Sequence, residues 1–227
     1  MNRPVLFILL FSLTVAGCGP AAEYFNGKGA GAFDRHDLPE ARKNFERASL
    51  LRPSDPALHN NLGYILCLQK DYDDAEAEFG KALARHPDAK LSRQIKINQA
   101  VLYGDTGATF RDPARKDWPR KGIAVLDQLL VSDPDNAEFH MRLGFACFQV
   151  SDPGRGFMEL DKAVRLATPE KAGQYTADPI GGSLSILRQV EKFYASVRLF
   201  KKLAEVQKDI RELERKEKAL QPSMNPH

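Results

Sequence analysis

Two amphipathic helical patterns follow one another in residues 58–88, LHNNLGYILCLQKDYDDAEAEFGKALARHPD. Small residues at Gly63, Ala75 and Ala82 would let two antiparallel helices approach closely, because no bulky side chain separates them there. Pro87 would end the second helix, since proline cannot continue the hydrogen-bond ladder. The space around the contact would be filled by Leu62, Leu66, Tyr72 and Phe79. The stretch therefore predicts a helix–turn–helix unit that must stack on neighbours to bury its apolar surface.

The same spacing recurs along the chain with a period of about 34 residues. It is seen in an earlier copy at Gly29, Ala41, Phe45, Ala48 and Pro53, and in later copies at Gly122, Leu126, Leu129 and Pro134, then Leu143, Gly144, Cys147, Gly156, Leu160 and Ala163. This pattern resembles the tetratricopeptide repeat. The resemblance implies an all-α solenoid of about four helix pairs with a long C-terminal capping helix.

The predicted organisation has a repeat region at 23–170, made of units at about 22–55, 56–89, 90–136 and 137–170. The third unit has a helix from about Ser92 to Tyr103 and then an insertion at 105–117. The segment from Arg111 to Lys121 carries five basic and two acidic residues. Trp118 follows in KDW, which echoes KDY at Tyr72, so we expect it to be buried at the start of the next helix. The loop itself would be either a spacer or a contact for anionic groups.

A linker is expected at 171–183, a C-terminal helix at 184–220 and a disordered tail at 221–227. Ser183 or Ser185 could cap this helix, and an apolar face could close the end of the solenoid. That face comprises Ile186, Leu187, Val190, Phe193, Tyr194 and Val197, and a heptad seam continues at Leu199, Leu203, Val206, Ile210 and Leu213. The seam favours either self-association or a solvated helix with pairs such as Glu212–Lys216 and Glu214–Lys218.

The N-terminus has the form of a secretory signal, with Arg3 before an apolar segment at 5–15 that is too short to span a bilayer. Val15, Ala16, Gly17 and Cys18 resemble the lipobox of bacterial lipoproteins. The resemblance implies a signal peptide at 1–17, lipidation of Cys18, a tether at 18–22, and a place on the periplasmic face of the outer membrane. The alternative is an ordinary signal that happens to precede a cysteine.

Charge and cysteine content exclude some functions. The full chain has a net charge of +3 and would lose Arg3 on processing, so bulk charge does not suggest nucleic acid binding. Cys67 and Cys147 lie two repeats apart, too far for a disulfide. We expect both to be small buried hydrophobes.

Catalytic and metal-binding patterns are weak. The GGSLS segment lacks the last glycine of a nucleophile elbow, and DYDDAEAEF lacks the glycine and final glutamate of a calcium loop. His59 and His140 recur at one repeat position, which is typical of packing residues. The sequence therefore predicts no enzyme activity, metal, cofactor or small-molecule substrate.

Binding of a partner protein is the class of function that the sequence still favours. In tetratricopeptide proteins the first helices of successive repeats line a groove, and by resemblance it would comprise Asn60, Tyr64, Cys67, Leu68, Asn98, Val101, Leu102, Met141, Phe145 and Phe148. Amides suit a peptide backbone and apolar side chains suit apolar anchors. The alternative is that several of these residues pack between helices. The expected partners are envelope proteins of pilus assembly or secretion. An adaptor of peptidoglycan enzymes and an enzyme with an unrecognised site stay open.

Overall fold

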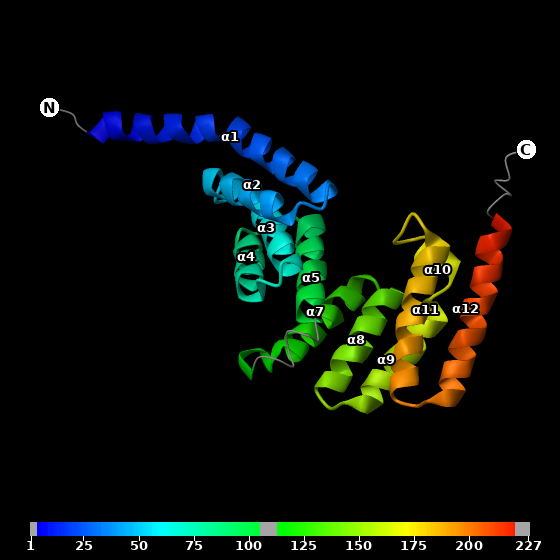
Figure 1. Ribbon diagram of the computed structural model, residues 1–227. Helices are drawn as coiled ribbons and strands as arrows, with labels where there is room; N and C mark the ends of the chain where they lie inside the picture. Colours follow the sequence, from blue (N-terminus) through cyan, green and yellow to red (C-terminus); the bar gives the residue numbers. More distant parts are fainter. Residues whose placement is uncertain (1–3, 105–112, 221–227) are drawn as a thin grey trace, which may run out of the picture. The chain divides into compact units, whose positions relative to one another are not determined.

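The computed structural model describes residues 4–104 and 113–220, and every regular element among them is helical. The chain divides into two compact units, Met1–Arg111 and Asp112–His227. The first contains α1 (Pro4–Asp34), α2 (Leu38–Leu51), α3 (Pro56–Leu68), α4 (Tyr72–Ala84) and α5 (Ala89–Tyr103). The second contains η1 (Pro113–Arg115), α7 (Trp118–Ser132), α8 (Ala137–Gln149), α9 (Pro153–Leu166), α10 (Pro169–Ala172), α11 (Pro179–Ser196) and α12 (Phe200–Leu220). Figure 1 labels the α-helices.

Consecutive helices pair as the repeat spacing predicts, with α1 on α2, α3 on α4 and α8 on α9. Small residues explain how closely they pack. A Cβ atom added at Gly63 would lie 2.8 Å from the Phe79 ring, and one at Gly144 would lie 2.8 Å from Leu160. Ala75 is fully buried at the same contact. The prediction that small residues bring the two helices together is confirmed.

Each pair closes through the same kind of turn. Lys70 and Ser151 have φ values of 67° and 61°, and the next amide donates to a carbonyl five residues earlier, with Asp71 N to Leu66 O at 2.9 Å. This is the hydrogen bond of a Schellman motif, which satisfies a free carbonyl at the end of a helix. Among the described residues, seven helices begin at an acidic or polar N-cap residue whose side chain accepts a backbone hydrogen bond. These residues are Asp37, Asp55, Asp88, Asn136, Asp152, Thr168 and Asp178.

Two buried histidines tie their repeats together in the same way. His59 Nε2 donates to the Pro53 carbonyl at 2.9 Å, and its Nδ1 lies 2.6 Å from Glu78 Oε2. His140 has the matching contacts with Pro134 and Glu159. Each ring thus joins the turn before the repeat to both of its helices. This is the packing role that the sequence predicts for both histidines.

The third predicted repeat is divided between the units, with α5 in the first and α7 in the second. Residues 105–112 of its insertion lie outside the described residues, whereas 113–115 form the short helix η1. Trp118 is buried at the first position of α7, as Tyr72 is at the first position of α4, and Arg115 stacks over its ring at 5.2 Å. The expected burial of Trp118 is confirmed.

The C-terminal region differs from the expected single helix at 184–220. It forms an antiparallel pair, α11 and α12, which lie side by side in Figure 1. Arg198 adopts a φ of 58°, and Leu199 N donates to Tyr194 O at 2.9 Å, so this turn repeats the geometry of the repeats. Helix α11 begins at Pro179 because Asp178 caps it, and neither predicted serine does. Ser183 is buried and donates to the Pro179 carbonyl.

The predicted closing face is largely confirmed. Ile186, Leu187, Val190 and Tyr194 join the core of the second unit, although Val197 is exposed. The heptad seam packs into this same core through Val206, Ile210 and Leu213, with Leu199 and Leu203 half-buried beside them. The seam therefore packs within the chain, in place of the solvated single helix or the seam with a second copy that the sequence left open. On the outer face Glu212 pairs with Lys216 at 3.0 Å as expected, whereas Glu214 pairs with Arg188.

Cys67 and Cys147 are not joined in a disulfide. Cys147 is buried, and desolvation raises the pKa of its thiol to about 11. It is therefore protonated and unreactive near neutral pH. Cys67 is only half-buried, so the prediction of a buried residue holds for Cys147 alone. Within the described part of the chain, no helix combines the length and hydropathy needed to cross a bilayer.

Candidate functional site

The predicted groove in the first unit is partly accessible. Tyr64 and Val101 are half-exposed, and Leu68 at the end of α3 is exposed. The Tyr64 ring meets Phe33 of α1 edge to face, with 5.8 Å between centroids. These side chains from α1, α3 and α5 form an apolar face on the first helices of the unit. Leu102, which was predicted to belong to it, is fully buried and belongs to the core instead.

The amides of this face serve the fold. Asn98 Nδ2 donates to Asn60 Oδ1 at 2.9 Å, which links α5 to α3. Asn61 Nδ2 donates to Asn26 Oδ1 at 3.1 Å, which links α3 to α1. Both Asn60 and Asn98 are buried, and Gln94 also donates to Asn98. The predicted role of these two amides in binding a peptide backbone is replaced by a role in joining successive repeats.

In the second unit the predicted groove is covered by the chain itself. Met141 is 1% exposed and lies in the core. Phe145 and Phe148 are half-buried because Phe193 of α11 packs on both, with centroids 5.5 and 4.6 Å apart. Phe148 also contacts Phe157 of α9 at 4.8 Å. Met141, Phe145 and Phe148 therefore hold α11 in place. This is the packing alternative that the sequence left open.

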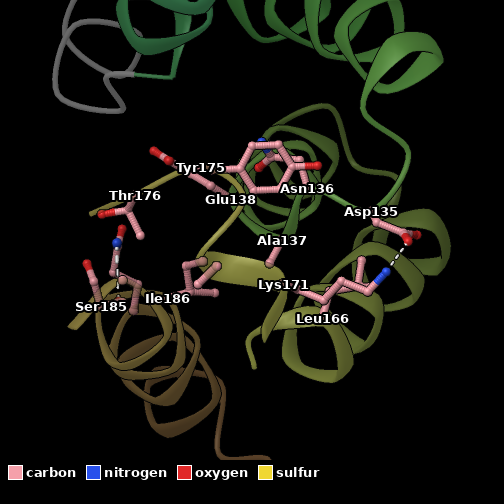
Figure 2. A pocket seen from close by; sticks show the side chains of 13 residues that line it. Asp135, Asn136, Ala137, Glu138, Leu166, Lys171, Tyr175, Thr176, Ser185 and Ile186 are labelled. Atoms are coloured by element: carbon pink, nitrogen blue, oxygen red, sulfur yellow. Dashed lines mark hydrogen bonds and ion pairs between the residues drawn. The ribbon is translucent and has the colours of Figure 1, made fainter. Parts of the chain in front are cut away.

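A pocket of about 210 Å³ remains open beside α11. The start of α8, the short helix α10, the segment after it and the first turns of α11 all contribute to its wall. In the view of Figure 2, Thr176 and Ser185 lie on one side of the pocket and Asp135 with Lys171 on the other, while Ile186 and Ala137 lie between them. Further lining residues are Asn136, Glu138, Leu166, Ala172, Tyr175, Gly182 and Gln189.

Glycines explain how the chain folds around this pocket. A Cβ atom at Gly182 would lie 2.8 Å from Thr176 Cγ2, and one at Gly181 would lie 2.0 Å from the Asp178 carboxylate. The absence of these side chains gives the segment at 176–178 room to fold onto the first turn of α11. Asp178 Oδ1 then accepts from Gly181 N at 3.0 Å and fixes the start of the helix.

The charged groups around the pocket are paired with one another. Lys171 Nζ donates to Asp135 Oδ2 at 2.5 Å, and this hydrogen bond raises the pKa of Lys171 and lowers that of Asp135. Glu138 accepts from Arg142 at 2.7 Å. What the pocket offers a ligand is mainly hydroxyl and amide groups around an apolar floor. Such a lining suits a short peptide segment better than a highly charged group.

This pocket was not predicted from the sequence, because residues 171–183 were expected to form a linker. Five lining residues come from that segment or from its border with α11, namely Lys171, Ala172, Tyr175, Thr176 and Gly182. The signal that could have found it is the GG pair, which permits close approach of another backbone. A second signal is the series of hydroxyl residues at Tyr175, Thr176 and Ser185.

The remaining predictions concern metals and the lipid anchor. In the parts of the chain that the structure covers, no group of three or more histidine, cysteine or acidic residues is arranged to hold a metal ion. Asp73 and Asp74 of the acidic stretch lie in the first turn of α4, where they complement the helix dipole. The side chain of Cys18 lies outside the described part of α1, and the predicted tail at 221–227 also lies outside the described residues.

Comparison with known proteins agrees with the helix pairs. Residues 27–90 match the family model of the tetratricopeptide repeat. The structure of MamA 41-end from Desulfovibrio magneticus RS-1 has a TM-score of 0.63 at 20% identity, over 87% of this chain and 97% of that chain. A tetratricopeptide repeat protein from Parabacteroides merdae ATCC 43184 has a TM-score of 0.55 at 20% identity, over 86% of this chain and 73% of that one.

YrrB, described as a TPR protein with an unusual peptide-binding site, has a TM-score of 0.53 at 13% identity, over 86% of this chain and 90% of that one. At these identities the likeness establishes a shared fold. The all-helical tetratricopeptide architecture predicted from the sequence is confirmed.

Proposed function

From the tetratricopeptide repeat fold, which is typical of non-enzymatic scaffolds for protein–protein interaction, we propose that this protein is a lipid-anchored scaffold of the bacterial envelope. The proposal places it on the periplasmic face of the outer membrane, where it docks proteins of a machinery such as pilus assembly or secretion. The lipobox resemblance at residues 15–18 supports the anchor. The helix pairs support the scaffold.

The pocket beside α11 is the observation that carries partner binding. Its hydroxyl and amide groups can hydrogen-bond to an extended backbone, while Ala137, Leu166 and Ile186 can accept a small apolar side chain. YrrB, which shares the fold, is described as having a peptide-binding site. We therefore assign the partner segment to this pocket rather than to the face around Phe145, which Phe193 covers. The half-exposed face of Tyr64 and Leu68 is a second place where a partner could extend.

Filling the pocket should abolish capture of the partner without unfolding the protein. Ser185 is exposed on α11 and lines the pocket, so an arginine in its place would occupy much of about 210 Å³. We expect Ser185→Arg to weaken binding about 30-fold or more, as loss of a central anchor does. The measurement is a pull-down from solubilised envelope followed by identification of the proteins and titration of the one that is lost.

Ala195→Arg is the matched control, because Ala195 is exposed on the same helix and lies outside the pocket lining. It should capture the partner as the wild type does. Equal capture by both variants would remove the pocket from the proposal. The identity of the partner also separates the candidate pathways, since recovery of a peptidoglycan enzyme would favour the adaptor role.

A further inference from the structure

The turn between α11 and α12 exposes apolar side chains. Phe200 is 69% exposed and Val197 is 42% exposed, one on each side of Leu199, which is half-buried against the core. Together with Arg198, Leu199 and Lys201 they form what we call the tip, residues 197–201. Large exposed side chains of this kind are normal when single. Two large exposed apolar side chains at one turn, close to several positive charges, are typical of an interaction site.

The charge at the tip has one sign. No acidic residue occurs from 192 to 204, and Lys192, Arg198 and Lys201 are all exposed. No ion pair between these three cations and an acid is found in the described parts of the chain. Lys202 differs, because it pairs with Asp161 of α9. The tip therefore presents two apolar side chains together with Arg198 and Lys201, for which the described parts of the chain show no ion pair.

The tip is also held rigidly in its exposed position. Leu199 N donates to Tyr194 O, and the Tyr194 hydroxyl donates to Asp161 Oδ1 at 2.9 Å. Tyr194 is buried behind the turn, while Val206 packs on the α12 side. These contacts hold the backbone of the turn in place. The apolar and cationic side chains of the tip are therefore carried by a fixed turn.

We propose that the tip is a contact site for an anionic membrane surface. Phe200 and Val197 enter the headgroup region, where apolar side chains leave water, and the surrounding cations contact the lipid phosphates. The contact needs no partner in the pocket, and it acts whether or not an acyl chain anchors the protein. With an anchor it would fix which end of the second unit faces the bilayer.

A tryptophan reporter tests the contact where it is proposed. Phe200→Trp is placed in the full-length chain carrying Cys18→Ser, and vesicles contain brominated lipid, which quenches only indoles that enter the bilayer. The native Trp118 is buried and gives a constant background. Met158→Trp is the control, because Met158 is also 69% exposed in the same unit but lies on α9.

We expect vesicles of phosphatidylcholine with phosphatidylglycerol to quench the reporter at 200 and to leave the one at 158 unchanged. Replacing Arg198 and Lys201 with serine should weaken the binding that the reporter detects about 25-fold, or roughly fivefold for each cation. Circular dichroism checks that each variant is folded. No quenching at 200, equal quenching at both sites, or equal quenching by vesicles of phosphatidylcholine alone would each overturn the proposal. Binding of an acidic protein at the tip without quenching would overturn it as well.

Discussion

Cys18→Ser should abolish incorporation of a fatty-acid probe and leave the protein unprocessed or released from the outer membrane fraction. In lipoproteins of the kind that this N-terminus resembles, the sulfur atom of the cysteine receives the diacylglyceryl group. Serine has no sulfur atom to alkylate. Each buried methylene adds about 0.8 kcal/mol of membrane affinity, so losing several acyl chains removes nearly all of the anchoring. Metabolic labelling and membrane fractionation measure both effects.

Cys67→Ser is the control for that experiment, because Cys67 lies in the folded repeats and should keep full labelling. Labelling of Cys18→Ser at the wild-type level would contradict the anchor. A lipid on Cys18 would also limit the place of the first unit. Ala22, which is fully buried against Ala48 and Leu58, lies four positions after Cys18 in the chain. Even a fully extended chain spans only about 14 Å over four positions.

Phe79→Ala should lower the free energy of unfolding by about 3–5 kcal/mol. The Phe79 ring is fully buried and fills the space left by Gly63, so its removal leaves a cavity that the two helices cannot close. Chemical denaturation followed by circular dichroism measures the change. Leu50→Ala is the control, because Leu50 is 79% exposed in the same unit and should change the stability little. Similar losses in both variants would contradict the assigned packing of α3 on α4.

The helix pairs could be predicted because their packing depends on a few residues at fixed spacing. Gly63 and Phe79 meet in space as their positions in the repeat require, and Gly144 and Leu160 do so again. The C-terminal hairpin was missed because its turn has no such marker. Arg198 takes the left-handed conformation as Lys70 and Ser151 do, but Leu199 follows where three other turns have an aspartate. The apolar face that ends at Val197 and the heptad seam that begins at Leu199 follow one another almost without a break, which predicted one helix where two form.

The repeat register predicts which helix carries each groove residue, but it does not predict whether that residue is exposed. Register places Met141 and Phe145 on the first helix of their repeat, as observed. Whether a side chain on that helix is free depends on what packs over it, and α11 brings Phe193 there from 48 residues away in the chain, counted from Phe145. The pocket could not be predicted for the same reason. Its walls come from α8, α10 and α11, which only the tertiary fold brings together.

Site-specific photocrosslinking in the producing cells tests the central claim, that this protein binds a partner segment in the pocket. A benzophenone amino acid replaces Gln189, which lines the pocket, or Val131, which is 85% exposed on α7 of the same unit. We predict one defined envelope protein crosslinked from position 189, lost when Ser185→Arg fills the pocket, and absent from position 131. The same products from both positions, or no product from 189, would contradict the claim.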